Sequence, residues 1–546
     1  MRPRLRGPLG PGQAALALTT ALLATCIAPE ARAAPARADL IIRGGTVYDG
    51  SSAEPVVADV VVSGDRIAYV GPDGAQRYQA RRSLDATGLA VAPGFIDPHG
   101  HPDGLAPADG APARLVLPWL MQGVTTVFVG VDGAGPPGSP TDIGGFLRRL
   151  AKRPAGVNVA TYVGFGAVRE QVLRSEARAP TAGELRRMEA LVAQGLCDGA
   201  LGLSTGLFYP PQSFASTEEV VALARVAGAR GGLYDSHLRD ESSYTVGLIA
   251  AVEEAIRIGR EAGLPVHIAH IKALGVDVQG KAPEVIALIE AARARGQDVT
   301  ADQYPWDASG TSLEAALVPR WAFDGGRRRM LARLADPALA GRLATEIGEN
   351  LRRRGGARAL MPVAAGQPWS GQRLDAIATG WRLDPVAAAI RIMRAQSHDT
   401  AAISFNMVDS DIELFMRQPW VVTGTDGSTG HPRMYATYPR KFATYVLEKR
   451  TLSMAEFING STGRTADMFA LADRGHLRVG AFADIVVLDP ARFRPEADYL
   501  HPRVLSTGVL ALVVNGRVAV DRGKPTGIAG GRPIVRSPPA GSCAGP

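Results

Sequence analysis

Two histidines one residue apart follow an apolar segment near the start of the chain. His99 and His101 come directly after residues 89–96, and Asp97 and Asp103 lie on either side of them. If the apolar segment is a buried strand, both imidazoles point to the same side, because side chains alternate along a strand. Two such imidazoles provide half of a tetrahedral metal site. A turn with two polar histidines explains these residues about as well, since motifs this short recur by chance.

The segments that must position these residues alternate between strands and helices. Helices are predicted between the strands, for example over 217–229 and 247–262, where apolar residues recur at three- and four-residue spacing. Eight strands that alternate with helices predict an α/β fold, a (β/α)8 TIM barrel. Residues 306–419 are too many for one barrel loop and predict an insertion between strands seven and eight. The eight predicted strands are 91–97, 124–131, 157–164, 200–204, 232–236, 265–269, 298–304 and 420–424.

The ends of these strands carry an unusual share of the polar residues. In such a barrel the active site lies at the carboxyl ends of the strands. Imidazoles and carboxylates there can hold one or two Zn²⁺ ions, and Asp426 can take a proton from an attacking water and return it to a leaving amine. His267 lies an odd number of residues from His270, so we expect it to face the core or support a ligand from behind. The predicted metal ligands are His99, His101, Asp132, His237, His270 and Asp426.

The two ends of the chain have a different texture from the middle. Short β-branched runs broken by Gly and Asp predict one small β domain, built from residues 34–92 and 478–536 together, beside a barrel over 93–477. Residues 537–546, rich in Pro, Gly and Ser, are predicted to form a disordered tail.

The first 33 residues have the pattern of a secretory signal peptide. Three arginines precede an uncharged run over 13–29, and small residues at 31–33 supply a cleavage site. The run is too short for a stable transmembrane helix, and no later segment is long and apolar enough to be one. We therefore expect export to the periplasm or the medium; lipid anchoring through Cys26 is the less favoured alternative. Only Cys197 and Cys543 remain after cleavage, so we do not expect a disulfide scaffold.

Composition limits the remaining classes of function. The chain has 546 residues, 46% of them hydrophobic, enough for one large core and a second small one. Its net charge of +7 includes arginine runs at 327–329 and 352–354 that lack aromatic partners. A nucleic-acid surface needs basic residues gathered on one face together with aromatic residues, so no nucleic-acid partner is predicted.

Seven motifs, in order along residues 39–527, resemble the amidohydrolase superfamily and within it the D-aminoacylases, which hydrolyse N-acyl-D-amino acids. The resemblance implies a barrel, a small β-sandwich domain built from both termini, zinc held mainly by His237 and His270, and Asp426 as the catalytic aspartate. The motifs are GFIDPHGH (94–101), QGVTT (122–126), GLSTGL (202–207), SHLRDE (236–241), AHIKA (269–273), TADQYP (300–305) and GTDGSTGHPR (424–433).

The resemblance also implies how a substrate is held. Lys272 and Tyr304, with Arg440, would bind the α-carboxylate of an N-acylated amino acid, and Tyr209 would lie near the scissile carbonyl. Packing is the alternative role for Tyr304 and Arg440. The chain departs from the family at Asp132, where the family carries a cysteine; a carboxylate is a harder ligand and favours Mn²⁺ or Fe²⁺ as well as Zn²⁺. It also has Phe165 where the family often has histidine.

Two other functions remain to be weighed against hydrolysis of a linear amide. Cyclic amidases of the hydantoinase and dihydroorotase kind bridge two metals with a modified lysine at the end of strand four, but residues 199–206 contain no lysine. A catalytically silent barrel would be free to lose its strand-end histidines and aspartates, which this chain keeps. Residues of the insertion are expected to set the acyl and side-chain preference.

Overall fold

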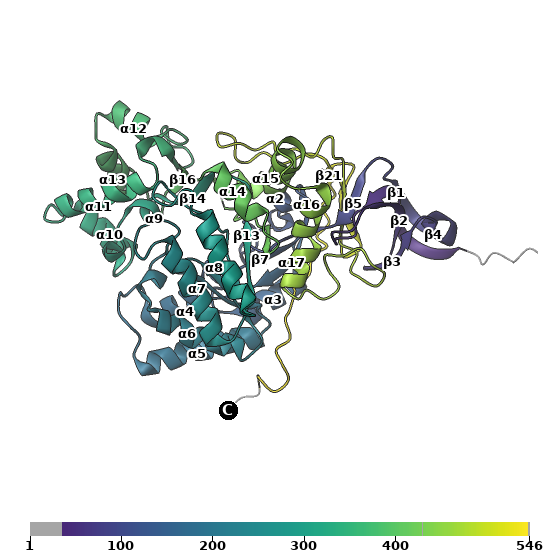
Figure 1. Ribbon diagram of the computed structural model, residues 1–546, viewed down its shortest axis with the longest axis horizontal. Helices are drawn as coiled ribbons and strands as arrows, with labels where there is room; N and C mark the ends of the chain where they lie inside the picture. Colours follow the sequence, from purple (N-terminus) through teal and green to yellow (C-terminus); the bar gives the residue numbers. More distant parts are fainter. Residues whose placement is uncertain (1–34, 429, 544–546) are drawn as a thin grey trace, which may run out of the picture.

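The computed structural model describes residues 35–428 and 430–543 (Figure 1). The predicted signal peptide and Cys26 lie outside these residues. The long axis of the molecule carries three parts in sequence: a β domain at one end, a barrel in the middle and the helices of an insertion at the other end. Among the described residues, no helix combines the length and apolar character needed to cross a membrane.

Parallel strands of the middle part follow one another in chain order around a ring. They are buried along their whole length, as β7 is, because helices cover one face and the ring interior the other. The ring closes where the Asp426 N–H donates to His99 O (2.8 Å) and the His101 N–H donates to Gly427 O (3.0 Å). The strands are β6 (Phe95–Asp97), β7 (Val124–Val129), β8 (Asn158–Thr161) with β9 (Val163–Gly164), β10 (Gly202–Gly206), β11 (Leu233–His237), β12 (Val266–Ile268), β13 (Val299–Gln303) and β17 (Val421–Thr423).

Helices pack their apolar faces on the outside of the ring. The helices predicted over 217–229 and 247–262 are confirmed, as α6 and α7. The helix α14 (Asp409–Met416), predicted as part of the insertion, packs on α8 and belongs to the ring of helices instead. The other helices around the barrel are α2 (Leu117–Leu120), α3 (Ile143–Lys152), α4 (Phe165–Leu173), α5 (Ala182–Cys197), α6 (Thr217–Gly228), α7 (Leu248–Ala262), α8 (Ala282–Ala294), α15 (Arg433–Arg440), α16 (Met454–Ser461) and α17 (Gly463–Met468).

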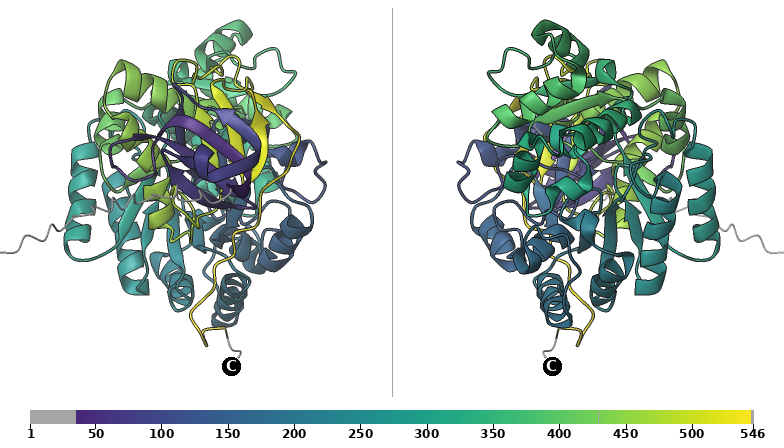
Figure 2. Two further views of the ribbon diagram at one scale, coloured as in Figure 1. Left: turned by 90° about the vertical axis from the view of Figure 1, so that its right-hand side faces the viewer. Right: turned by 90° about the vertical axis from the view of Figure 1, so that its left-hand side faces the viewer.

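Between β13 and β17 the chain builds a subdomain with its own core. An antiparallel sheet in the order β14-β16-β15 faces the barrel mouth, and helices pack behind it around apolar residues such as Leu313, Ile347 and Met393. These helices face the viewer in the right-hand view of Figure 2. The elements are β14 (Ala308–Ser312), α9 (Leu313–Leu317), α10 (Arg327–Ala335), α11 (Ala340–Arg353), β15 (Leu360–Val363), α12 (Leu374–Trp381), α13 (Pro385–Ala395) and β16 (Ala401–Phe405).

Strands from both termini form one nine-stranded sheet beside the barrel, and they lie side by side in the left-hand view of Figure 2. The junction is β5, which pairs parallel with β1 and antiparallel with β18. The sheet is curved around its apolar residues, and the Ile67 N–H in β3 donates to Ala481 O (2.9 Å), just before β18. The elements are β1 (Ala36–Val47), β2 (Val56–Ser63), β3 (Arg66–Gly71), α1 (Gly74–Arg77), β4 (Tyr78–Asp85), β5 (Ala90–Pro93), β18 (Ile485–Leu488), β19 (Val509–Val514), β20 (Arg517–Asp521) and β21 (Lys524–Pro525).

The C-terminal segment returns across the amino end of the barrel, so the prediction of a disordered tail is wrong for residues 537–543. Pro533 forms a bridge with Val159, and the Arg536 N–H donates to Gly199 O (3.1 Å). Cys543 is then bonded to Cys197, the last residue of α5. A composition rich in Pro, Gly and Ser predicts disorder, but it does not reveal that two cysteines 346 residues apart hold the segment in place.

We predict that Cys543→Ser lowers the free energy of unfolding by about 2–5 kcal/mol, because the bridge restricts the unfolded chain over a very long loop. Thermal or urea unfolding measures the change. A reductant should lower the midpoint of the unmodified protein and leave that of Cys543→Ser unaffected. Equal midpoints for the two proteins under oxidising conditions would show that the bridge does not stabilise the fold.

Candidate active site and metal centre

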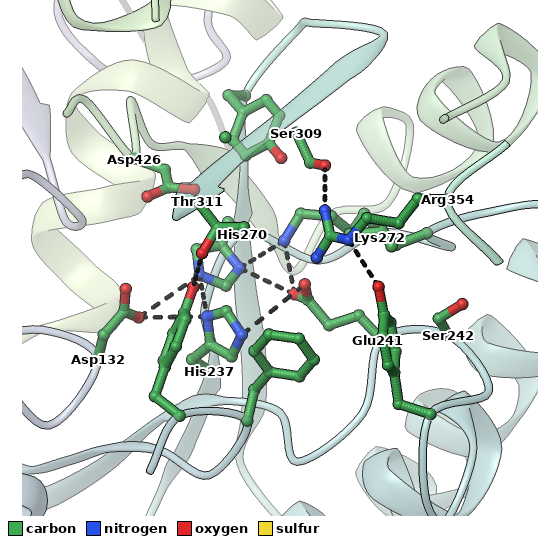
Figure 3. A pocket seen from close by; sticks show the side chains of 16 residues that line it. Asp132, His237, Glu241, Ser242, His270, Lys272, Ser309, Thr311, Arg354 and Asp426 are labelled. Atoms are coloured by element: carbon green, nitrogen blue, oxygen red, sulfur yellow. Dashed lines mark hydrogen bonds and ion pairs between the residues drawn. The ribbon is translucent and has the colours of Figure 1, made fainter. Parts of the chain in front are cut away.

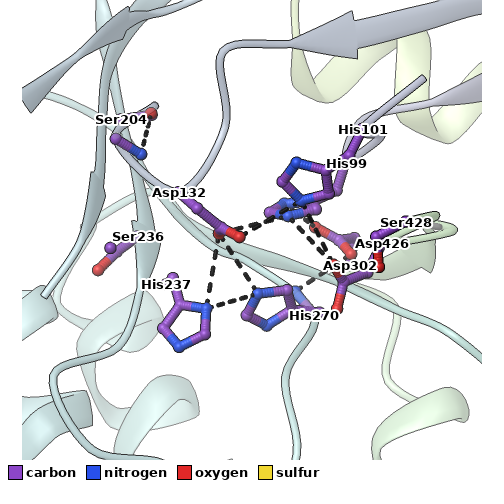
Figure 4. Close-up of polar contacts among 12 residues, drawn as sticks. His99, His101, Asp132, Ser204, Ser236, His237, His270, Asp302, Asp426 and Ser428 are labelled. Atoms are coloured by element: carbon purple, nitrogen blue, oxygen red, sulfur yellow. Dashed lines mark hydrogen bonds and ion pairs between the residues drawn. The ribbon is translucent and has the colours of Figure 1, made fainter. Parts of the chain in front are cut away.

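The side chains predicted as metal ligands converge at the carboxyl ends of the barrel strands (Figure 4). They form two groups, and within each group the candidate ligand atoms all lie within 4.8 Å of one another. The groups share one residue, Asp132, the residue that departs from the family pattern. The first group is His99, His101, Asp132 and Asp426, and the second is Asp132, His237 and His270.

The carboxylate of Asp132 lies between the two groups. Its Oδ1 is 3.4 Å from His99 Nε2 and 3.5 Å from both His237 Nδ1 and His270 Nε2. Its Oδ2 is 3.4 Å from His101 Nε2. Asp426 Oδ1 completes the first group at 3.5 Å from His101 Nε2. A single carboxylate can therefore contribute one oxygen to each of two cation positions.

Three of these residues have a positive φ angle, a backbone conformation that residues other than glycine rarely adopt. Asp132 (φ 55°), His270 (φ 35°) and Asp426 (φ 45°) each stand in the turn directly after a barrel strand. Residues held in this region cost of order 1–3 kcal/mol and cluster at functional sites. The turn at Asp132 is held by Ser204, whose hydroxyl donates to Gly130 O (2.6 Å) and accepts from the Gly133 N–H (2.9 Å).

A buried carboxylate behind the ligands ties the first strand to the last. Asp97 accepts hydrogen bonds from the Thr425 N–H (2.9 Å), the Thr425 hydroxyl (2.6 Å) and the Trp119 indole (2.6 Å). Burial raises the pKa of Asp97 to about 7 in spite of these hydrogen bonds. The contact fixes the turn that carries Asp426 relative to the strand that carries His99.

His267 supports the ligand residues from behind, one of the two roles predicted for it. Its Nε2 lies 3.0 Å from Asp302 Oδ2, and its Nδ1 lies 2.9 Å from Thr300 Oγ1. Asp302 in turn accepts from the His270 N–H (3.1 Å). His267 and Asp302 thus hold the backbone of a ligand residue from behind.

The donor atoms of the site fit a divalent cation. The two ring nitrogens of His99, Asp132 Oδ1 and His237 Nε2 are buried and make no hydrogen bond among the described residues. Such atoms are costly unless something satisfies them. Burial alone would lower the pKa of His101, but the carboxylates of Asp132 and Asp426 raise it to about 9. Imidazole nitrogens around carboxylates suit Zn²⁺ among other transition metals.

Three of the predicted substrate residues line a cavity beside the second group (Figure 3). Lys272 Nζ lies 2.5 Å from Glu241 Oε1 and 2.7 Å from His270 Nδ1. The Tyr304 hydroxyl is buried without a hydrogen bond among the described residues. Tyr209 packs on the His237 ring (4.8 Å between centroids), and its hydroxyl lies 3.2 Å from Thr311 Oγ1.

Arg440, the fourth predicted substrate residue, is not among the residues that line this cavity. Its Nε donates to Pro305 O (2.8 Å), and its guanidinium packs on the Trp306 ring at 4.2 Å. The arginine that reaches the site is Arg433, whose Nη1 lies 2.8 Å from Asp426 Oδ2. Arg433 is the first residue of α15 and Arg440 the last, so about two helical turns separate them.

Sequence reasoning left several polar residues of the site without a role. Glu241 and Arg433 lie inside two of the recognised motifs, a few residues after a strand end, and that position was the available signal. Arg354 lies in the insertion, where no strand end points to it. Its guanidinium lines the same cavity as His237 and His270.

Known proteins resemble this chain over most of its length. A family model described as "Amidohydrolase family" matches residues 323–520. A D-aminoacylase of Alcaligenes xylosoxydans xylosoxydans is 35% identical over 523 residues, covering 91% of this chain and 98% of its own. A solved D-aminoacylase with a binuclear metal centre matches with a TM-score of 0.76 at 33% identity, covering 91% of this chain and 100% of its own. An N-acyl-D-glutamate deacylase from Bordetella bronchiseptica, solved with zinc and a phosphonate inhibitor, has a TM-score of 0.76 at 29% identity and the same coverage. These matches confirm the predicted fold class.

We predict that Asp132→Ala lowers zinc occupancy about 10-fold or more at limiting zinc, because both ligand groups lose an oxygen at once. Elemental analysis after dialysis measures the loss. Asp298→Ala is the matched control, since Asp298 is an exposed carboxylate just before β13 at the opposite end of the barrel. Wild-type zinc content in a folded Asp132→Ala protein would remove Asp132 from the metal centre.

Proposed function

The chain belongs to the D-aminoacylase family of the amidohydrolases, and we propose that it converts an N-acyl-D-amino acid and water to a carboxylate and a D-amino acid. It is a hydrolase of carbon–nitrogen bonds other than peptide bonds, and the predicted resemblance is confirmed. The observation that carries the proposal is Asp426, an aspartate that lies against both a metal-ligand group and a buried arginine.

We propose zinc as the metal, in one or two positions that share Asp132. His237 and His270 would hold it with Asp132 on one side, and His99 and His101 with Asp132 and Asp426 on the other. The chemistry that zinc supplies is a lowered pKa for water and a polarised amide carbonyl. Support for two positions comes from the two ligand groups and from the binuclear centre of the related D-aminoacylase.

Asp426 is the proposed general base and acid. Burial would raise its pKa, but Arg433 and the neighbouring histidines lower it below its usual range, so the carboxylate is ionised at neutral pH. One of its oxygens can then accept the proton of the attacking water and give it to the amine nitrogen as the amide bond breaks. Arg433 holds Oδ2, which leaves Oδ1 turned towards the ligands.

Cationic and phenolic groups along the cavity are the proposed contacts for the rest of the substrate. Lys272, Tyr304 and Arg433 would bind the α-carboxylate; the Arg433 guanidinium lies 4.8 Å from the Tyr304 ring. Burial raises the pKa of Tyr209 well above its usual range, so its hydroxyl stays protonated and can donate to the carbonyl oxygen. The end of β10 carries no lysine, so the alternative of a cyclic amidase lacks the modified lysine that would bridge two metals.

We further propose that the protein is exported. The support is the arginine-rich, apolar pattern of residues 1–33 and the Cys197–Cys543 disulfide, since such bonds persist in oxidising compartments.

We predict that Asp426→Asn lowers kcat for N-acetyl-D-amino acids by about 10³-fold or more, because an amide cannot accept the proton. Amine release from paired D and L substrates measures activity, and elemental analysis should show zinc content near that of the unmodified protein. Asp298→Asn, the same change at the opposite end of the barrel, should leave both unchanged. Full activity in Asp426→Asn would remove this residue from the mechanism, and equal rates for D and L substrates would contradict the proposed selectivity.

A further inference from the structure

One buried arginine in the cavity has no anionic partner. Arg354 follows the last residue of α11 in the insertion, and its side chain reaches the cavity that His237 and His270 line (Figure 3). Only 2% of the residue is exposed. An arginine cannot lose its proton in a protein, so the charge persists wherever the side chain is buried.

The contacts of Arg354 are all with neutral hydroxyl groups. Its Nε donates to the Tyr244 hydroxyl at 2.6 Å, and its Nη1 lies 3.2 Å from Ser404 Oγ and 3.5 Å from Ser309 Oγ. Nη2 has no hydrogen-bond partner among the described residues, and within them no carboxylate lies within 4.0 Å of the guanidinium. Some of the N–H donors of the Arg354 guanidinium therefore have no acceptor among the described residues.

Other buried arginines of the protein are paired with carboxylates. Arg169 Nε lies 3.0 Å from Glu219, Arg433 pairs with Asp426, and Arg474 pairs with Asp484. A buried charge without a partner is strongly destabilising, so the pattern is what physical chemistry requires. Arg354 departs from this pattern, and it lines a cavity in which a ligand can supply the missing anion.

The carboxylates of the cavity cannot serve as that partner, because each already has one. Glu241 is held by Lys272 at 2.5 Å, and Asp132 and Asp426 face the metal-ligand histidines. A second cation lies close by, since the Arg320 guanidinium packs on the ring of the lining residue Phe208 at 3.8 Å. In Figure 3 Asp132 and Arg354 lie at opposite ends of the cavity, with Lys272 between them.

We propose that Arg354 binds a second carboxylate on the substrate, so that the preferred substrates are N-acylated D-amino acids with an additional acidic group. This inference rests on the proposed deacylase function. Lys272 and Arg433 lie nearer the scissile bond and take the α-carboxylate, while Arg354 meets a carboxylate further from it. That group is carried by an acidic amino-acid side chain or by a dicarboxylic acyl group, and both give the same bidentate pairing with a guanidinium.

The test compares substrates that differ in one charge. N-acetyl-D-glutamate and N-acetyl-D-glutamine have nearly the same shape, and N-succinyl-D-leucine and N-acetyl-D-leucine form the second pair. We expect kcat/KM to favour the acidic member of one pair by about 100-fold, the scale of a hydrogen-bonded charge pair in a buried site. The pair that shows the preference identifies which part of the substrate carries the second carboxylate.

Variants then assign the preference to Arg354. Arg354→Met should abolish the preference by lowering kcat/KM for the acidic substrate while sparing its neutral partner, and Arg354→Lys should restore part of it. Arg352→Met is the matched control, because Arg352 is on the same helix but exposed and paired with Asp277 and Glu349. It should leave both substrates unchanged.

Two results would overturn the inference, and a third would remove the function on which it rests. The unmodified enzyme could hydrolyse both members of each pair equally. Arg354→Met could lower both equally, which would give Arg354 a structural role or place it on the α-carboxylate. Amine release from neutral D substrates without any acidic preference would leave the deacylase function standing and remove this subsite, whereas no release from any substrate would remove the deacylase function itself. If Arg354→Met does not fold, the preference of the unmodified enzyme and its reduction in Arg354→Lys still decide the matter.

Discussion

The carboxylate of Asp132, surrounded by four imidazoles, makes the contacts on which the site depends. Each of the four rings places a nitrogen 3.4 or 3.5 Å from it, and those rings come from three different strand ends. A barrel is suited to this, because parallel strands bring their carboxyl ends to one rim. The positive φ values at Asp132, His270 and Asp426 are the local cost of turning three side chains towards one point. The histidines that surround the carboxylate are His99, His101, His237 and His270.

Chemistry and selectivity are divided between two parts of the chain. The barrel rim supplies the metal ligands and Asp426, whereas the insertion supplies Arg354, Thr311 and Ser309 to the same cavity. Strand ends fix atoms tightly, because each strand is hydrogen-bonded to its neighbours. A subdomain with its own core can change the residues it presents without disturbing the rim.

Sequence patterns predicted the site residues at the strand ends but not those that the insertion contributes. A period of two predicted that His99 and His101 share a side and that His267 faces the core or supports a ligand. In the structure the first two both face Asp132, and His267 is bonded to the supporting Asp302. Arg440 is not among the residues of the site because about two turns of α15 separate it from Arg433, and only the arginine at the start of the helix reaches Asp426. Arg354 follows a helix in a subdomain whose packing no periodicity describes. The disulfide between Cys197 and Cys543 joins a barrel helix to the C-terminal segment, two parts of the chain that composition alone treats as unrelated.

The central claim is that Asp132 shares its carboxylate between two metal positions. Anomalous diffraction from crystals of the protein loaded with zinc tests it most directly. The account predicts a peak about 2.0–2.2 Å from an Asp132 oxygen and from the facing nitrogens of His237 and His270, and at higher zinc a second peak against the other oxygen. Zinc bound by the histidines with Asp132 turned away, or zinc found only outside the barrel rim, would contradict the account.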